Sequence, residues 1–274
     1  MLTEQTFDAN GVSLNYALGP ASGPPLLLLH GITERWQTFL PLIPYLTPKW
    51  QVYALDLRGH GQSGRVENSY RIIDYAQDIV CFLESQIGKG AVILGHSLGA
   101  LAAMYTAANQ PKQVKALLLV DPPLHLQHTP LKDIPNGPYE AFKQVVEILR
   151  TSQSRQAIQQ ALVKHFPEGD LEAHRARAEV LSQLDPGALA MSLENHHLDR
   201  IDLDALLLQI ECPTYLIQGN PKRGAALLDQ DVDRALGLLR YWNHISILEG
   251  GHMLHHSHPE AVSNVLDDFY DQSM

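Results

Sequence analysis

The serine at position 97 carries the strongest chemical signal in this sequence, within the segment 95–99, Gly-His-Ser-Leu-Gly. The apolar run 91–94 precedes this segment, and a helical pattern follows it. A G-x-S-x-G pattern between a buried strand and a helix is typical of a sharp turn that exposes a nucleophilic hydroxyl. The helix N-terminus would favour the negative charge that develops during attack on a carbonyl. We therefore interpret Ser97 as a nucleophile, the alternative being a serine that only caps the helix.

A histidine that could serve as the base follows the last apolar run of the chain, 245–248. His252 comes after two glycines, and a histidine on such a loop can reach a serine at the end of a neighbouring strand. A metal site is the alternative, because His255, His256 and His258 follow closely. No cysteine or carboxylate pattern accompanies these three histidines, so we expect them to be exposed polar residues and predict no metal.

Two backbone amides could bind the oxyanion. His30-Gly31 ends the apolar run 25–29, and a glycine there would let the next amide, that of Ile32, turn toward the site. Together with the amide of Leu98, it could form an oxyanion hole. The alternative is that His30-Gly31 is only a turn. We expect His30 itself to be a packed, hydrogen-bonded residue and not a catalyst.

The elements that would position these residues are short apolar runs separated by helical patterns. Continuous apolar runs of this length favour strands buried on both faces, as in a parallel sheet. Helical spacing follows Asp74, with Gln77 completing a capping box, and again follows Ser97. Asn10-Gly11 predicts a hairpin near the start. The alternation predicts a doubly wound, mostly parallel α/β sheet. The predicted strands are 25–29, 52–55, 91–94, 116–120, 214–217 and 245–248.

The interval 124–205 shows helical patterns and no strand pattern, and it is too long for a loop. We predict a helical cap there, inserted into a core formed by residues 1–123 and 206–274. The cap offers Phe142, Phe166 and Met191 as apolar lining, which favours a small to medium, largely apolar substrate group.

The motifs of this chain stand in an order that resembles the α/β-hydrolase superfamily over essentially the whole sequence. They are His30-Gly31, the segment 56–63 (Asp-Leu-Arg-Gly-His-Gly-Gln-Ser), the segment 95–99, and Gly251-His252. The segment 56–63 is similar to the loop after the fourth strand of that family, and 124–205 stands where the family carries its cap. The resemblance implies a triad of serine, histidine and an acid.

The acid departs from the family's common pattern. The family usually places it just after the seventh strand, where this chain has 219–224, Gly-Asn-Pro-Lys-Arg-Gly, without an acid. A known alternative position is the end of the sixth strand, which Asp121 occupies. The nearest acids beyond 219–224 are Asp229 and Asp231. We prefer Asp121 to Asp229, although an Asp-Pro pair can also simply form a turn.

Composition limits the classes of function. The 274 residues are 45% hydrophobic, which suits one large domain with an insertion. The formal net charge of −10 argues against nucleic acid and anionic membranes as partners. The N-terminus does not resemble a signal peptide, no apolar run is long enough to cross a bilayer, and the two cysteines are expected to be reduced. We expect a soluble cytoplasmic protein with a small-molecule substrate and no cofactor, and we predict no oligomeric state.

These interpretations together predict a serine hydrolase for an ester-type carbonyl substrate, with Ser97 as nucleophile, His252 as base and Asp121 as orienting acid. Serine at the elbow excludes the haloalkane dehalogenases and epoxide hydrolases of the superfamily, which use aspartate. Three alternatives stay open: a cofactor-free perhydrolase resembling haloperoxidases, a carbon–carbon bond hydrolase, and a non-catalytic ligand-binding protein. Met253 weakens the second, because the ring-cleavage hydrolases that share this resemblance usually carry tryptophan after the catalytic histidine.

Overall fold

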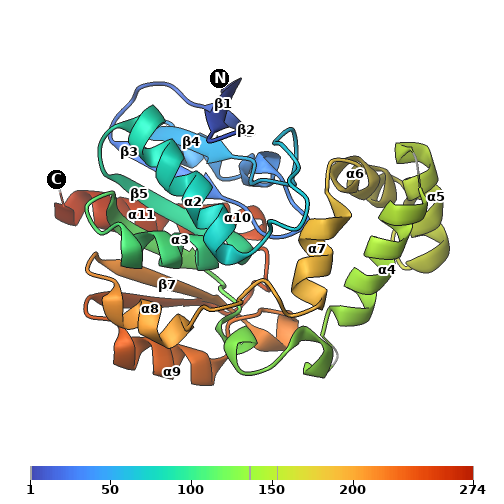
Figure 1. The fold of residues 1–274 in the computed structure, drawn as a ribbon. Helices are drawn as coiled ribbons and strands as arrows, with labels where there is room; N and C mark the ends of the chain where they lie inside the picture. Colours follow the sequence, from blue (N-terminus) through green and yellow to red (C-terminus); the bar gives the residue numbers. More distant parts are fainter. Residues whose placement is uncertain (1, 136, 153, 274) are drawn as a thin grey trace.

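The computed structural model describes residues 2–135, 137–152 and 154–273, and its centre is an eight-stranded sheet (Figure 1). The strand order is β1-β2-β4-β3-β5-β6-β7-β8. The pairs from β4 to β8 are parallel, whereas β1–β2 and β2–β4 are antiparallel. The predicted mostly parallel α/β fold is therefore confirmed. The strands are β1 (Thr3–Ala9), β2 (Val12–Leu18), β3 (Pro25–Leu29), β4 (Gln51–Leu55), β5 (Ala91–His96), β6 (Val114–Val120), β7 (Thr214–Gly219) and β8 (Trp242–Ile247).

The β1–β2 hairpin turns at Asn10 and Gly11, as the sequence predicts. Both residues have a positive φ, 53° and 94°, which a tight two-residue turn of this kind requires. The strands pair from Thr3 with Leu18 to Ala9 with Val12. The hairpin thus extends the sheet beyond β4.

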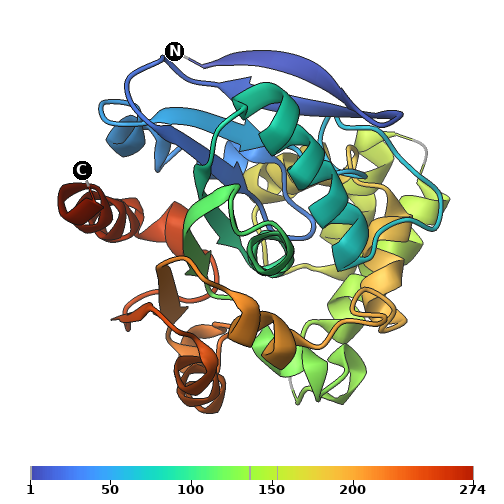
Figure 2. The ribbon, with the colours of Figure 1, turned by 60° about the vertical axis from the view of Figure 1, so that its left-hand side comes forward.

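Helices cover both faces of the sheet, as Figure 2 shows. On β3, Leu27 and Leu29 belong to one buried apolar cluster, and Leu26 and Leu28 belong to a second. This alternation explains why the central strands are apolar at every position. One face carries α2 (Ile72–Phe82), α3 (Leu98–Asn109), α8 (Leu203–Gln209) and α9 (Asp229–Leu238), and the other carries α1 (Ile43–Leu46) and α11 (Pro259–Ser273).

Helix α2 begins earlier than the capping pattern predicts. Its first residue is Ile72, and Asp74 lies inside the first turn, so the expectation that Asp74 and Gln77 cap the helix is wrong. The Asp74 carboxylate instead accepts a hydrogen bond from the backbone amide of Arg71 at 2.9 Å. It also bonds the Arg71 guanidinium, which makes the earlier start favourable. After Phe82, a π-helical turn (Leu83–Ile87) completes the segment.

The interval between β6 and β7 is helical throughout its described part, residues 124–135, 137–152 and 154–205, and contains no strand there. In Figure 1, α4, α5 and α6 lie to one side of the sheet. Helix α8 crosses the predicted boundary at 205 and packs on α3 with the sheet. The division into cap and core stays a prediction. The elements are η3 (Leu124–Gln127), η4 (Leu131–Asp133), α4 (Tyr139–Thr151), α5 (Arg155–His165), α6 (Leu171–Leu181), α7 (Pro186–Leu193) and α8.

Four short elements complete the described chain: η1 (Trp36–Phe39), η5 (Pro221–Arg223), α10 (Leu254–Ser257) and the loop between β8 and α10 that carries His252. Among the described helices, none combines the length and the apolar character that a bilayer crossing requires.

Candidate active site

Ser97 occupies a single-residue turn between β5, which ends at His96, and α3, which begins at Leu98. Its backbone has φ 51° and ψ −114°, a conformation that residues with a side chain rarely adopt. Its amide donates to the carbonyl oxygen of Val120 at 3.1 Å, and the amide of Gly99 donates to that of His30 at 3.1 Å. These bonds fix the turn to both neighbouring strands.

The two glycines of the segment 95–99 make room for this turn. A Cβ atom on Gly99 would lie 2.3 Å from the carbonyl oxygen of Leu29, and one on Gly95 would lie 2.5 Å from the carbonyl oxygen of Gly99. Such contacts are with backbone, which cannot move aside easily. The close approach of α3 to β3 therefore depends on both glycines.

The structure joins His252 to Asp121, because Nδ1 of His252 lies 2.6 Å from Oδ2 of Asp121. The Asp121 carboxylate is fully buried. It accepts hydrogen bonds from the amides of Ala226 (2.6 Å), Leu227 (3.2 Å) and Gly219 (3.3 Å). These donors compensate for burying a charge next to the imidazole.

Asp229 lies elsewhere. Its carboxylate accepts a hydrogen bond from Nε2 of Gln218 at 2.8 Å, at the start of α9. Oε1 of the same glutamine lies 3.1 Å from Nε2 of His244. Of the two candidate acids, the structure therefore brings only Asp121 to His252.

The two amides of the predicted oxyanion hole are free to bind a ligand. Ile32 and Leu98 line the same cavity as Ser97 and His252. Within the described chain, neither amide has a protein acceptor. His30 has the packing role expected of it, because its Nδ1 donates to the Gly31 carbonyl at 2.8 Å and its Nε2 accepts from the Leu57 amide at 3.0 Å. Burial lowers the pKa of His30 to about 4, so the ring is neutral near pH 7.

The cavity has a volume of about 830 Å³ and opens between the carboxyl ends of the strands and the helices of the interval 124–205. Of the three apolar residues expected to line it, only Phe142 does so. The expectation for Phe166 and Met191 is wrong, because both pack against the apolar core beside the sheet. The cavity is large enough for a small organic substrate.

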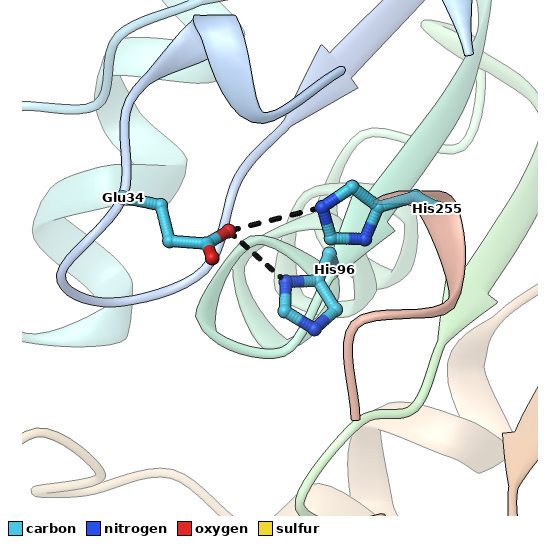
Figure 3. A group of neighbouring side chains, drawn as sticks. All are labelled: Glu34, His96 and His255. Carbon is cyan, nitrogen blue, oxygen red and sulfur yellow. Dashed lines mark ion pairs between the residues drawn. The ribbon is translucent and has the colours of Figure 1, made fainter. Parts of the chain in front are cut away.

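His255 also differs from expectation. It was expected to be exposed, but its side chain is fully buried because α10 packs it against η1. Its Nε2 lies 3.0 Å from Oγ1 of Thr38 and 3.9 Å from Oε2 of Glu34. The same Glu34 oxygen lies 3.5 Å from Nδ1 of His96, which makes a buried group of three (Figure 3).

This group of Glu34, His96 and His255 borders the site and has unusual electrostatics. Burial lowers the pKa of both histidines. Burial also raises the pKa of the Glu34 carboxyl, but the three surrounding histidines more than offset this, so its pKa lies well below its usual range. Nε2 of His96 donates to the His252 carbonyl at 3.0 Å, so a neutral His96 turns an unprotonated Nδ1 toward the carboxylate. A shared proton would satisfy this contact, and the three side chains could also hold a divalent cation.

Two polar residues of the cavity wall, Arg177 and His197, have no precursor in the sequence patterns. Arg177 is one of several arginines on an amphipathic segment, and His197 lies in a histidine pair between helices. Neither position carries a motif, so only the folded chain shows that they face the same cavity as Ser97.

Comparison with known proteins follows from this geometry. A family model described as the alpha/beta hydrolase fold matches residues 24–259. A 2-(acetamidomethylene)succinate hydrolase from Mesorhizobium japonicum is 32% identical over 58% of this chain, and that match spans about half (54%) of the relative. A pimeloyl-(acyl-carrier protein) methyl ester esterase from Neisseria meningitidis is 30% identical over 92% of this chain and 78% of that protein.

Solved structures share the whole fold. The crystal structure of E-2-(acetamidomethylene)succinate hydrolase superimposes with a TM-score of 0.76 at 24% identity, covering 99% of this chain and 100% of that chain. At this identity the likeness shows the fold alone. The two curated relatives are hydrolases by name, which supports hydrolase activity for this chain. The family match, the sheet order and the motif order agree, and the chain therefore belongs to the α/β-hydrolase fold family.

Proposed function

We propose that this chain is a serine hydrolase that cleaves an ester-type carbonyl substrate through an acyl-enzyme. One observation carries the proposal: the buried carboxylate of Asp121 holds the ring of His252 at 2.6 Å, in the cavity that Ser97 lines from its strained turn. A ring held through Nδ1–H leaves Nε2 as the atom that can accept a proton. That is the requirement for activating a serine hydroxyl.

The proposed reaction begins when Nε2 of His252 takes the proton of Ser97 and the serine oxygen bonds to the substrate carbonyl carbon. The amides of Ile32 and Leu98 hold the resulting oxyanion. His252 then gives its proton to the leaving alcohol as the carbon–oxygen bond breaks. Water, deprotonated by the same ring, releases the acid and restores Ser97. Asp121 stabilises the charged imidazole in each step.

Esters are preferred to the other substrates of the family on one comparison of wide coverage. The Neisseria relative, which aligns over 92% of this chain, is an esterase by name. We also propose that the substrate is a small molecule, because the cavity is bounded by the helices of the interval 124–205.

Hydrolysis of p-nitrophenyl butyrate tests the proposal. Wild-type protein should release p-nitrophenol, and Ser97→Ala should reduce kcat by about 10⁴-fold or more. A fluorophosphonate should label Ser97, as mass spectrometry would show. Ser257→Ala, which removes an exposed serine outside the cavity, should keep both turnover and labelling. Turnover that survives in Ser97→Ala, or labelling of another residue, would refute the proposal, and a protein that binds esters without turnover would belong to the ligand-binding alternative.

A further inference from the structure

We propose that Arg177 anchors a free carboxylate, so that the preferred substrate is a carbonyl compound that carries a second, anionic group. The inference concerns substrate class and rests on the proposed function for the reaction itself. It starts from the wall of the cavity opposite the sheet, where α6 contributes the Arg177 side chain.

The Arg177 guanidinium is held next to the reacting centre. Its Nη1 donates to the carbonyl oxygen of Thr33 at 3.0 Å, and its Nη2 donates to the hydroxyl of the same threonine at 2.8 Å. Thr33 directly follows Ile32, whose amide belongs to the proposed oxyanion hole. A guanidinium carries five N–H donors, and the described structure gives acceptors to two of them. Donors therefore remain for a ligand in the cavity.

The positive charge of Arg177 has no ionic partner in the described parts of the chain. Arg35, by contrast, pairs with Glu179 at 2.8 Å. The acid nearest in effect to Arg177 is Glu34, which is instead engaged with His96 and His255. Arginine keeps its charge at all ordinary pH values, and a partly buried, unpaired cation is costly. An anionic ligand would supply the missing partner.

His197 gives an independent sign of a ligand on the same wall. Its side chain is only 2% exposed, and neither ring nitrogen has a partner in the described chain. Its carbonyl oxygen accepts from the amide of Ile72 at 2.9 Å, which fixes the residue to α2. Burial lowers the pKa of His197 to about 4, so the neutral ring has one N–H to donate near pH 7. An ester alkyl chain could use neither this donor nor those of Arg177, whereas a carboxylate accepts from both types.

Matched ester pairs test the anchor and locate the carboxylate. On the acyl side, mono-p-nitrophenyl glutarate is compared with p-nitrophenyl butyrate. On the leaving-group side, 4-carboxyphenyl butyrate is compared with phenyl butyrate. We expect the carboxylated ester of at least one pair to have the higher kcat/KM. Arg177→Gln should lower that ratio by about 30-fold or more, because it removes one partner of a charge-assisted contact. Arg177→Lys should retain part of the preference.

Arg175→Gln is the matched control, because Arg175 lies on the same helix but is exposed to solvent. This variant should leave the ratio unchanged. An Arg177→Gln ratio equal to that of wild type would overturn the anchor. Thermal unfolding of each variant separates misfolding from loss of recognition, and Arg177→Lys keeps the test open if the glutamine variant does not fold.

Calorimetric binding of glutarate to Ser97→Ala separates this inference from the proposed function. If glutarate binds, and Arg177→Gln in the same background abolishes binding, while wild-type protein hydrolyses no ester, the anchor stands and the serine hydrolase fails. If neutral esters are hydrolysed through Ser97, but carboxylated esters gain nothing and glutarate does not bind, the hydrolase stands and the anchor fails.

Discussion

Oδ2 of Asp121 lies 2.6 Å from Nδ1 of His252, and the same oxygen lies 2.6 Å from the amide nitrogen of Ala226. One carboxylate oxygen therefore serves both the imidazole and the segment that follows β7. The segment after β7 contributes backbone donors to the carboxylate and no acid of its own. This arrangement explains how a member of this family can carry its acid at the end of β6 and still orient the same histidine.

The first prediction separates the two carboxylates. Asp121→Asn should lower kcat by about 10³- to 10⁴-fold with little change in KM, because an amide cannot stabilise the charged ring and favours the wrong tautomer. Asp229→Asn should keep nearly normal kinetics, because Asp229 bonds Gln218 and not His252. Steady-state kinetics on p-nitrophenyl butyrate measure both variants. The reverse pattern would mean that Asp229 is the orienting acid.

The second prediction concerns the backbone strain at Ser97. Ser97→Gly and Ser97→Ala should both be inactive, but the glycine variant should be the more stable by about 1 kcal/mol. The reason is that a residue without Cβ adopts φ 51° and ψ −114° at little cost. Urea unfolding followed by circular dichroism gives the two free energies. Equal values would show that the turn stores no strain.

The third prediction tests the close approach of α3 to β3. Gly99→Ala should destabilise the protein by about 3 kcal/mol or more, because the new Cβ would lie 2.3 Å from a backbone oxygen of Leu29. Gly237→Ala is the control, since a Cβ there meets nothing within 4 Å and lies on helix α9. That variant should be as stable as wild type or more so by up to about 1 kcal/mol. A Gly99→Ala protein with wild-type stability would contradict the tight contact.

The fourth prediction is a loss of stability in mild acid. Burial lowers the pKa of His60 to about 3 and that of His30 to about 4, against 6.5 for an unburied histidine. Below about pH 6.5 the unfolded chain therefore binds protons that the native state refuses, and the free energy of unfolding falls as the pH decreases. Their contribution is complete above pH 6.5 and declines toward pH 4.

Urea unfolding between pH 7 and pH 5 measures this slope, because most carboxyls titrate below that range. His60→Asn should reduce the slope, since its amide can still donate to the Arg58 carbonyl that His60 Nδ1 now contacts at 2.8 Å. His256→Asn changes an exposed histidine and should leave the slope unaltered. A stability that is constant from pH 7 to pH 5 would argue that the native state admits these protons.

The fifth prediction addresses the group of Glu34, His96 and His255. Dialysis against a strong chelator should leave ester hydrolysis unchanged, because no step of the proposed reaction uses a metal ion. Elemental analysis of the purified protein before and after dialysis accompanies the assay. A stoichiometric metal that is lost together with activity, and restored with it by added zinc, would show that these three side chains hold a working cation.

The central sheet and the Ser97 turn could be predicted because each depends on local sequence. Strands buried on both faces must be apolar at every position, so β3 and β5 stand out as runs. The turn at Ser97 needs glycines at fixed offsets, which also leave a visible pattern. Asp121 could be named only by combining position with the family resemblance, and the structure brings it to His252 while its catalytic role stays a prediction.

The environments of His255 and Arg177 could not be predicted, because they arise from contacts far apart in the sequence. The segment Leu254–Ser257 has the composition of an exposed turn, and its second residue is buried only because α10 packs on η1. Arg177 faces the cavity only because Thr33, 144 residues away, accepts its hydrogen bonds. The cap residue Phe166 shows the same limit, since helical spacing does not reveal which side a helix turns toward the cavity.

The pairing of β6 with β7 has a consequence for how the chain folds. Leu117 pairs with Thr214 and Val120 with Ile217, so these parallel neighbours meet only after the entire interval between them has been brought back on itself. Closing so long a loop is entropically expensive, whereas the helices inside it form from local contacts. The order of events should therefore be helices first and this strand pair late. Until β7 docks, Asp121 lacks its amide donors, so the chemistry of the site would mature in the last stage of folding.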